Sequence, residues 1–513
     1  MGNKLLQRKT YIEVEGSSQY MGTYLALDMG AESGRLMAVE IGNSINTREI
    51  YRFSTPVIND ERGRRCWDFP KIMSEVITAL KIAAPDGPYL SIAVDTWGLD
   101  FGLLDKDRKL IGLPVSHRDH RTDGYLEKAA AMVGKDRLHG DTGSQLLEVN
   151  SIYQLLAITE QTPDELVDAQ YLLLMPDLVL HALTGVVGTE YTIASTTGLY
   201  DVPNNRWATK LADDLGIPTK LFGEVQDAGT IRGVLSKELQ ELTGIGPIPC
   251  IATASHDTAS AVVSTPFTAP GNAYISSGTW SLLGVELNNS VINDLTLKYR
   301  LTNEGGFGRN TRLLCNIAGL WLIQEVRRDL KLQGIDLTYA QLVELAEAEP
   351  DRWRTLIFVD DPVFIHAGEM IARIQMFAEK TGQPIPNTPG ELAQCIFASL
   401  AFQYARIAKV LHECSGIPMP AIQIIGGGSQ NALLSQLTAD ISGLEVIAGP
   451  IEATAMGNAI VQAIALGEIS SLEEGRKIVR ASDLKIKSYL PDQDIKIRSE
   501  IMQLQIRYES LIN

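Results

Sequence analysis

Acidic residues end several apolar runs of this chain, at places where proteins commonly bind ligands. Asp28 closes the run YLALD, Asp95 follows SIAV, and Asp257 follows IATASH. Open α/β sheets bind ligands beyond the carboxyl ends of their strands, so all three acids are candidates for a site. Asp28 could hold a hydrated magnesium ion beside phosphates, although a solvated acid in a turn explains it equally well. Asp257 precedes a predicted helix, and capping of that helix is its alternative role.

Small residues follow the first of these acids in a turn that could cradle an anion. Residues 26–41 read ALDMGAESGRLMAVEI, which predicts two strands joined by a turn longer than strand reversal requires. The backbone amides of residues 30–34 could approach phosphate oxygens closely. The turn has neither the Gly-Lys-Ser/Thr of a P-loop nor the Gly-x-Gly-x-x-Gly of a dinucleotide fold, so a plain loop is the alternative.

Two turns in the second half of the chain offer the same chemistry. Residues 273–287 read AYISSGTWSLLGVEL, and the hydroxyls within residues 276–279 could bind phosphoryl oxygens. The triple glycine Gly426–Gly428 stands between a predicted strand and a helix expected from about Ser429. Its amides would then lie at the positive end of the helix dipole, although a close helix–strand crossing also explains three glycines.

The elements that position these turns alternate between strand and helix. The pattern predicts strands around residues 91–105, a helix over 163–185 and a long helix over 390–416. This order favours two α/β domains with mixed sheets and a boundary near residues 266–271. The hairpin tails LMAVEI and LLGVEL lie about half the chain length apart, which a duplicated domain would produce, although similar hairpins also arise independently.

Composition excludes several classes of partner. The chain has 45 basic and 62 acidic residues, and its net charge of -17 repels a nucleic-acid backbone. Five scattered cysteines predict reduced thiols, and His117 with His120 lacks a third zinc ligand. No segment resembles a membrane span, and the first twenty residues lack the apolar core of a signal peptide. We therefore expect a cytoplasmic protein without a nucleic-acid or membrane partner; the sequence sets no oligomeric state.

Eight motifs occur along the chain in a fixed order. They read DMGAESGR, DTWGLDFGLLD, ASHDTASA, SSGTWSLLG, TNEGG, NIAGLWLIQE, IIGGGSQN and AGPIEATAMGN. Over roughly residues 22–490 these motifs resemble those of the FGGY carbohydrate kinases. The resemblance implies two ribonuclease H-like domains of the actin-like ATPase class, with the ligands in a cleft between them. It divides the chain into an extension (1–20), an N-terminal domain for sugar and phosphate (21–266), a C-terminal nucleotide domain (267–490) and a helical tail (491–513).

The resemblance also assigns roles to residues by position, with ATP and Mg²⁺ as the implied cofactors. Asp257 would accept the proton of the sugar hydroxyl, and Asp28 would hold the magnesium ion. The residues implied at the nucleotide are Ala31, Glu32, Ser33, Gly34, Arg35, Thr279, Gln324, Gly426, Gly427 and Gly428. Those implied at the sugar are Gly98, His256, Asp257, Thr258 and Asn316. Glu32 departs from the pattern, since kinases of this kind often have Ser there.

The reaction implied by the resemblance is phosphorylation of the small ketose L-rhamnulose by ATP at its 1-hydroxyl. A kinase for L-fuculose or D-xylulose would keep the nucleotide motifs and differ in its sugar pocket. A sugar-binding regulator without activity could use the same fold, although the chain retains Asp28, Asp257 and Thr279.

Overall fold

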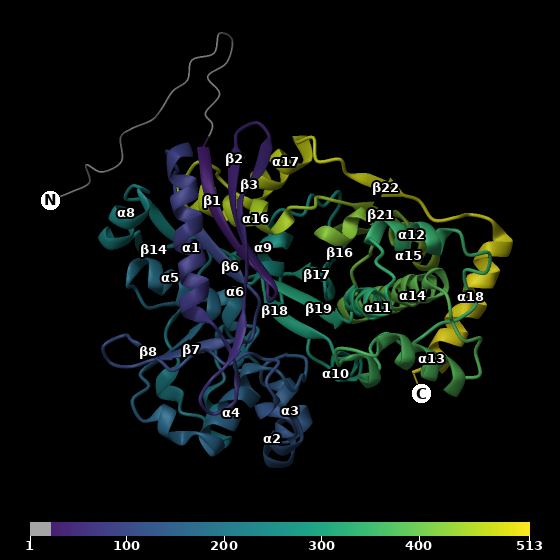
Figure 1. Cartoon of the computed structure of the whole chain (residues 1–513), viewed down its shortest axis with the longest axis horizontal. Coiled ribbons are helices and arrows are strands. Elements are labelled where there is room, and N and C mark those ends of the chain that lie inside the picture. The colour runs from purple at the N-terminus through teal and green to yellow at the C-terminus, as the bar shows by residue number, and fades with distance from the viewer. Residues whose placement is uncertain (1–21, 513) are drawn as a thin grey trace, which may run out of the picture.

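The computed structural model describes residues 22–512 and has two lobes, each built around a mixed β-sheet (Figure 1). In the N-terminal lobe the strands lie in the order β14 (Thr230–Val234), β15 (Pro249–Ala252), β6 (Ile92–Thr96), β1 (Gly22–Met29), β2 (Ser33–Ile41) and β3 (Ile45–Ser54). In the C-terminal lobe the order is β18 (Thr302–Gly305), β19 (Thr311–Ile317), β17 (Ser281–Leu287), β16 (Ala273–Ser277), β20 (Ala421–Ile425), β21 (Glu445–Ala448) and β22 (Lys487–Tyr489).

One strand order underlies both sheets. Strands β1, β2 and β3 form an antiparallel meander, and β6 and β15 extend the sheet from β1 in parallel. Strands β16, β17 and β19 form the matching meander, and β20 and β21 extend it in parallel. The two hairpins with similar tails are therefore the first two strands of each sheet. The predicted pair of α/β domains with mixed sheets is confirmed.

Helices and short strands fill the connections. The longer helices are α1 (Phe69–Ala83), α2 (Tyr125–Val133), α4 (Ser151–Gln161), α5 (Met175–Thr184), α11 (Trp321–Leu332), α12 (Tyr339–Glu347), α13 (Met370–Lys380), α14 (Pro389–Ser415), α15 (Ala432–Ser442), α16 (Ala453–Ala465), α17 (Leu472–Ala481) and α18 (Ile495–Ser510). The shorter ones are α3 (Lys135–Gly140), α6 (Tyr191–Ala194), α7 (Thr209–Asp214), α8 (Lys237–Thr243), α9 (Asp257–Val263) and α10 (Asp294–Lys298). Strands β7 (Phe101–Leu104), β8 (Leu110–Ile111) and β9 (Tyr171–Leu174) form a small separate sheet.

Local sequence explains where the longest helix begins and ends. In α14 the Thr388 side chain accepts the amide of Glu391, whose own side chain accepts the Thr388 amide, so two otherwise unpaired donors are satisfied. Pro389 occupies the first helical position, where a missing N–H costs nothing. Gly416 ends the helix in the left-handed conformation at φ 67°. The predicted helix over 390–416 is thus confirmed.

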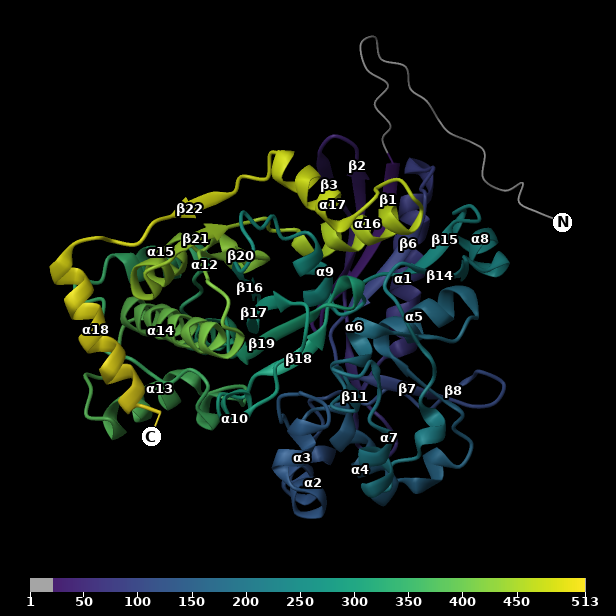
Figure 2. The same ribbon diagram turned by 180° about the vertical axis from the view of Figure 1, so that it is seen from behind.

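Two helices lie between the sheets and join the lobes. Helix α16 comes from the second half of the chain, yet its Met456 and Ile460 pack with Tyr24 and Met37 of the N-terminal sheet. Both views show this helix beside β1 to β3 (Figures 1 and 2). Helix α9 packs between α16 and the C-terminal sheet, where Val262 meets Tyr274. The other face of the N-terminal sheet is covered by α1, α5 and α8.

The prediction for residues 163–185 is wrong in its first half. Residues 171–174 form strand β9, which pairs with β7, and helix α5 begins only at Met175. A four-residue apolar run fits a buried strand as well as a helix, and Pro176 has no amide to continue a helix that began earlier. The helix expected from Ser429 also begins later, at Ala432, because Asn431 caps it by accepting the Leu434 amide at 3.0 Å.

The ends of the chain complete the description. The proposed extension 1–20 lies outside the described residues. Within the proposed tail 491–513, α18 buries Ile501 and Tyr508 against the core of the C-terminal lobe and crosses one end of α14 (Figure 2). Among residues 22–512, none of the helices combines the length and apolarity needed to span a membrane.

Candidate active site

The three acids singled out from the sequence gather at one edge of the N-terminal sheet. Asp28 and Asp95 are paired neighbours on the parallel strands β1 and β6. The next residue of β6, Thr96, forms a parallel bridge with His256, which brings Asp257 to the same edge. The carboxyl ends of neighbouring strands therefore place the three acids together, as the sequence indicates.

Two of these carboxylates, Asp95 and Asp257, differ in how far they are buried. The Asp95 residue is 0% exposed, whereas the Asp257 side chain is 34% exposed. Asn458 of α16 donates to Asp95 Oδ2 at 2.6 Å, and Asp95 Oδ1 is buried without a hydrogen-bond partner among residues 22–512. Burial raises the pKa of Asp95 well above its ordinary value, and the neighbouring Asp28 charge raises it further.

Asp257 occupies the first turn of α9 but does not cap it. The capping residue is His256, which makes no capping bond with its side chain. Asp257 Oδ1 accepts the backbone amide of Thr258, its own neighbour, and the Thr258 hydroxyl at 3.2 Å. Burial raises the pKa of the Asp257 carboxyl, the His256 charge opposes this, and the Asp28 charge adds to it.

Four side chains from both lobes form a connected group around Asp257. His256 Nε2 lies 3.4 Å from Asp257 Oδ1, and His256 Nδ1 lies 3.2 Å from Glu304 Oε2 on β18. Arg312 of β19 donates to Glu304 Oε2 at 3.0 Å. Burial alone would raise the pKa of Glu304, but the His256 bond and the Arg312 charge hold it below its ordinary value.

The first glycine turn is tied to the second half of the chain by charge. Arg35 donates to Asp28 Oδ2 at 2.8 Å and pairs with Glu452 Oε2 at 2.6 Å. Glu452 precedes α16, so this arginine links both lobes. Gly34 serves packing: a Cβ there would lie 2.5 Å from the Phe53 ring. Of the remaining predicted residues in the turn, Glu32 is exposed and Ala31 and Ser33 are half-buried.

The other predicted nucleotide residues meet at the end of β16. Gln324 Nε2 donates to Thr279 Oγ1 at 3.4 Å. A Cβ at Gly426 would lie 3.0 Å from the Ser277 carbonyl, and one at Gly428 would lie 1.9 Å from the Ser277 hydroxyl. These two glycines allow the close packing, which was the alternative explanation for the triple glycine. Close packing does not explain the middle glycine, Gly427, because a Cβ there would lie more than 4 Å from the atoms of the described residues outside its own turn.

The residues predicted at the sugar come from both lobes. Asn316 of β19 donates to Gln145 of the N-terminal lobe at 2.9 Å. Gly98 approaches Thr196 so closely that a Cβ would lie 3.0 Å from its hydroxyl. The next residue, Leu99, adopts the left-handed conformation at φ 77°, which costs of order 1–3 kcal/mol and persists only where surrounding contacts enforce it.

A buried acid supports this strained loop. Asp100 Oδ2 accepts from the indoles of Trp67 and Trp97 at 2.7 and 2.9 Å and lies 2.9 Å from His117 Nδ1. Burial alone would raise the pKa of Asp100, but the His117 charge and these hydrogen bonds hold it below its ordinary value. The loop therefore leaves the sheet edge beside the acids in a fixed conformation.

Several residues of this site were not predicted. Glu304, Glu452 and Asn458 stand in the motifs TNEGG and AGPIEATAMGN, but their partners lie far away in sequence. Arg312 carried a usable signal, because it is the charged residue in the apolar run TRLLCNI of a buried strand. Charge inside such a run indicates a buried partner.

Asp28 fits a magnesium ion that is held mainly through phosphates and water. Among residues 22–512 there is no group of three His, Cys, Asp or Glu side chains that could hold a metal by itself. Magnesium commonly keeps several waters and binds one or two carboxylates together with substrate phosphates. Asp28 at the sheet edge supplies such a carboxylate, whereas the neighbouring Asp95 is enclosed by the protein.

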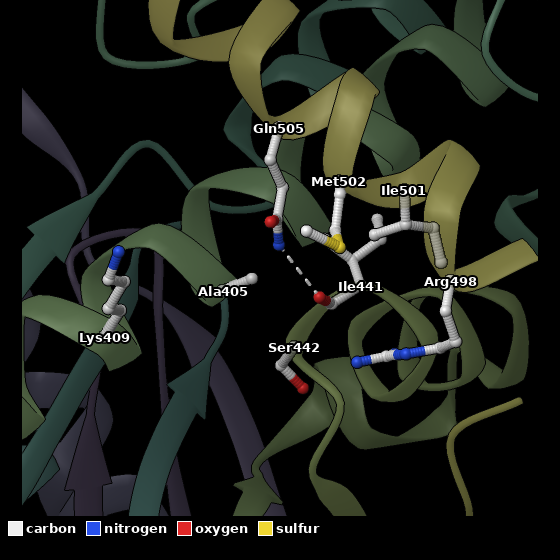
Figure 3. Close-up of a pocket in the computed structure, with 8 residues that line it drawn as sticks. All are labelled: Ala405, Lys409, Ile441, Ser442, Arg498, Ile501, Met502 and Gln505. Carbon is white, nitrogen blue, oxygen red and sulfur yellow. Dashed lines mark hydrogen bonds between the residues drawn. The ribbon is translucent and has the colours of Figure 1, made fainter. Parts of the chain in front are cut away.

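A cavity of about 300 Å³ lies elsewhere, between α14, α15 and α18 (Figure 3). Gln505 donates to the Ile441 carbonyl at 3.1 Å, and Arg498 donates to the Asp440 carbonyl at 2.6 Å. These two polar groups satisfy the carboxyl end of α15, so their role here is structural. None of the three acids lines this cavity.

Comparison with known proteins identifies the family of this chain. The N-terminal domain of the FGGY family of carbohydrate kinases matches residues 23–264, and the C-terminal domain matches residues 273–466. The chain belongs to this family and is an ATP-dependent sugar kinase. A rhamnulokinase of Halalkalibacterium halodurans is 40% identical over 92% of this chain and 99% of its own length. A rhamnulokinase of Bacteroides thetaiotaomicron is 39% identical over 91% of this chain and 96% of its own length.

Solved structures share the fold at low sequence identity. Ligand-bound xylulose kinase from Lactobacillus acidophilus has a TM-score of 0.79 at 17% identity, covering 96% of this chain and 97% of that one. Glycerol kinase of Plasmodium falciparum with ADP has a TM-score of 0.77 at 17% identity, covering 96% and 98%. The two-lobed architecture is therefore that of the sugar kinases.

Proposed function

We propose that this protein transfers the γ-phosphoryl group of ATP to the 1-hydroxyl of L-rhamnulose, giving L-rhamnulose 1-phosphate and ADP. Relatives named rhamnulokinase, at 38–40% identity over most of the chain, support this sugar as the substrate. The structural observation that carries the proposal is Asp257, a partly exposed carboxylate beside two further acids at the edge between the lobes.

Asp257 is the proton acceptor in this proposal. A phosphoryl group passes through a loose transition state, so the chain must align the reactants, neutralise charge and receive one proton. An ordinary Asp, with a pKa of about 3.9, is a weak base toward an alcohol. The raised pKa of Asp257 makes it a stronger one, and the hydroxyl becomes acidic as its oxygen bonds to phosphorus. Its exposure lets a substrate reach it.

The glycine turns and Asp28 handle the phosphates in this proposal. Residues Ala31 to Arg35, Thr279 and Gly427 offer amides and hydroxyls to the phosphate oxygens, while Gln324 holds the Thr279 side chain. Asp28 would hold Mg²⁺, which neutralises phosphate charge when bound. On binding, Arg35 can exchange carboxylate partners for phosphate oxygens, since its fork suits both.

The sugar contacts are proposed to come from Gly98, His256, Thr258 and Asn316. Kinases for other ketoses keep the same phosphate chemistry, so only a substrate panel separates them. ADP release should be measured by a coupled assay with L-rhamnulose, L-fuculose, D-xylulose and L-ribulose. We expect the highest kcat/KM with L-rhamnulose. A tenfold preference for another ketose, about 1.4 kcal/mol in transition-state binding, would replace the sugar but keep the kinase.

A further inference from the structure

The proposed base is connected to a carboxylate of the opposite lobe through a single imidazole. Glu304 Oε2 on one side lies 3.2 Å from His256 Nδ1, and Asp257 Oδ1 on the other side lies 3.4 Å from His256 Nε2. Both ring nitrogens therefore face carboxylate oxygens, one from each lobe. Glu304 is 6% exposed, so its charge is held inside the protein by these contacts.

Arg312 and Glu304 both approach Nδ1 of this ring. Its Nη2 lies 3.0 Å from Glu304 Oε2 and 3.1 Å from His256 Nδ1, and its side chain is fully buried. A guanidinium only donates hydrogen bonds, so a bond from Nη2 to Nδ1 leaves the single proton of a neutral ring on Nε2. A doubly protonated ring, with Nδ1–H directed at Glu304, also carries a proton on Nε2. In these two forms Nε2 carries a proton and faces Asp257 Oδ1 at 3.4 Å, whereas a neutral ring with its proton on Nδ1 would donate to Glu304 and leave Nε2 without one.

The protein contacts of Asp257 leave one of its two oxygens available. Within residues 22–512, every hydrogen bond and ion pair of Asp257 ends on Oδ1, from the Thr258 amide and hydroxyl and from His256. Oδ2 is then the oxygen presented to a substrate. A general base works only while its oxygen stays within hydrogen-bond reach of the proton that it removes.

We propose that Glu304 is a positioning residue for phosphoryl transfer, which holds His256 and thereby orients Asp257 toward the sugar hydroxyl. This inference rests on the proposed role of Asp257 as proton acceptor. Glu304 and Arg312 belong to the lobe that carries Thr279 and the triple glycine. The orientation of Asp257 therefore depends on how the C-terminal lobe packs against His256. This dependence couples the nucleotide side of the protein to the sugar side.

A purely structural ion pair between the lobes is the competing explanation, and the chain contains a matched control for it. Glu286 of β17 lies opposite Arg312 in the sheet register and bonds Arg476 of α17 at 2.7 Å. The Glu286–Arg476 pair also joins two elements that lie far apart in the sequence. Among the described residues, Glu286 bonds Arg476 and makes no hydrogen bond or ion pair with His256. Glu286→Gln therefore removes a comparable partly buried ion pair and leaves the imidazole contacts in place.

Kinetics of the two variants separate the explanations. Glu304→Gln should lower kcat at least about tenfold, on the scale of the about 10- to 100-fold that hydrogen-bond partners of metal-binding histidines contribute. The KM for ATP should stay within about twofold, and Glu286→Gln should keep near wild-type kcat. In a His256→Asn background, Glu304→Gln should cost less than a further twofold, because it acts through the missing ring. Equal kcat losses in Glu304→Gln and Glu286→Gln would overturn the proposal.

A spectroscopic measurement tests the contact without turnover. The ¹⁵N shifts of the His256 ring in the resting protein, assigned by difference from His256→Asn, should show a proton on Nε2. They should change in Glu304→Gln and stay the same in Glu286→Gln; an unchanged ring in Glu304→Gln overturns the positioning role. If the wild type phosphorylates no ketose, the proposed function fails while this ring measurement still decides the contact. If Glu304→Gln does not fold, Glu304→Asp, which withdraws the carboxylate by one methylene, must give the same result.

Discussion

Carboxylates of the same kind acquire different chemistry from their surroundings at this sheet edge. Asp95 is sealed in the protein and bonded to Asn458, so no sugar can reach it without opening the fold. Asp257 is partly exposed, and all of its hydrogen bonds and ion pairs with the described residues end on one oxygen, Oδ1. This difference favours Asp257 over Asp95 as the base.

Asp257→Asn tests this assignment directly. Asn keeps an Oδ1 that accepts the Thr258 amide, so the fold should be retained. It cannot accept a proton from the hydroxyl, and loss of a general base typically costs about 10²- to 10⁴-fold in rate. We expect kcat to fall at least about a hundredfold, with little change in ATP affinity. If the variant keeps more than about a third of wild-type kcat with chemistry rate-limiting, Asp257 is not the base.

The middle glycine of the triple-glycine turn allows a clean test of nucleotide contact. A Cβ at Gly427 meets no atom within 4 Å, so Gly427→Ala should leave the melting temperature of the free protein unchanged. The added methyl group would block close approach of a phosphate to the backbone. A ligand at 100 times its Kd stabilises a protein by about 2.7 kcal/mol. We expect Gly427→Ala to lose most of the melting-temperature increase that Mg·ATP gives the wild type.

Gly246→Ala is the matched control, because a Cβ at Gly246 also meets open space. It should keep the full Mg·ATP shift. An equal shift in all three proteins would remove Gly427 from the nucleotide site. Gly34 is unsuitable for this purpose, since a side chain there collides with Phe53 and tests hairpin packing instead.

At the scale of elements, the sequence predicted the features that depend on residues close to one another along the chain. The hairpins, α14 and the acids at strand ends follow from short-range periodicity and from caps within a few residues. Strand β9 was missed because its apolar run YLLL becomes a strand only by pairing with β7, which lies far away in the sequence. The position of α16 was likewise beyond sequence reasoning, because its partners Tyr24 and Met37 lie in the first lobe.

The contact between α16 and α9 depends on one residue without a side chain. A Cβ at Gly457 would lie 1.7 Å from the Ser260 carbonyl oxygen, which is backbone and cannot rotate away. Gly457→Ala must therefore push the two helices apart, and overpacking of this kind typically costs about 1–3 kcal/mol. We expect a lower melting temperature and weaker activity, because α16 also carries the Asn458 bond to Asp95.

Gly140→Ala serves as the control for Gly457→Ala, since a Cβ at this helical glycine meets nothing within 4 Å. It should be neutral or slightly stabilising, because Ala has the higher helix propensity. A melting temperature of Gly457→Ala equal to that of Gly140→Ala would show that the crossing can relax without cost.

At the scale of the whole molecule, buried acids make the stability depend on pH in opposite directions. Burial raises the pKa of Asp177 to about 7 and that of Asp360 to about 6. For these two groups the folded protein binds more protons than the unfolded chain between the ordinary Asp pKa and the raised one. Their contribution to the free energy of unfolding is therefore present at low pH and is lost as pH rises through that window. Asp100 and Glu304, whose pKa values are lowered, act with the opposite sign.

Asp360 is the acid on which this linkage can be isolated. It is bonded to the Ala318 amide at 2.8 Å and to Gln403 Nε2 at 2.7 Å, so Asn can keep the first bond and a turned Gln403 amide can keep the second. Above the raised pKa, the wild type must hold an ionised carboxylate in the interior, whereas Asp360→Asn holds a neutral amide. A rise in the Asp360 pKa from 3.8 to about 6 corresponds to a loss of roughly 3 kcal/mol at most in the free energy of unfolding, at about 1.36 kcal/mol per pH unit.

We expect the melting temperature of Asp360→Asn relative to wild type to rise from pH 4.5 to pH 7.5. The exposed Glu61, changed to Gln, should show no such trend, and a difference that is constant or falls with pH would show that burial does not set the protonation of Asp360.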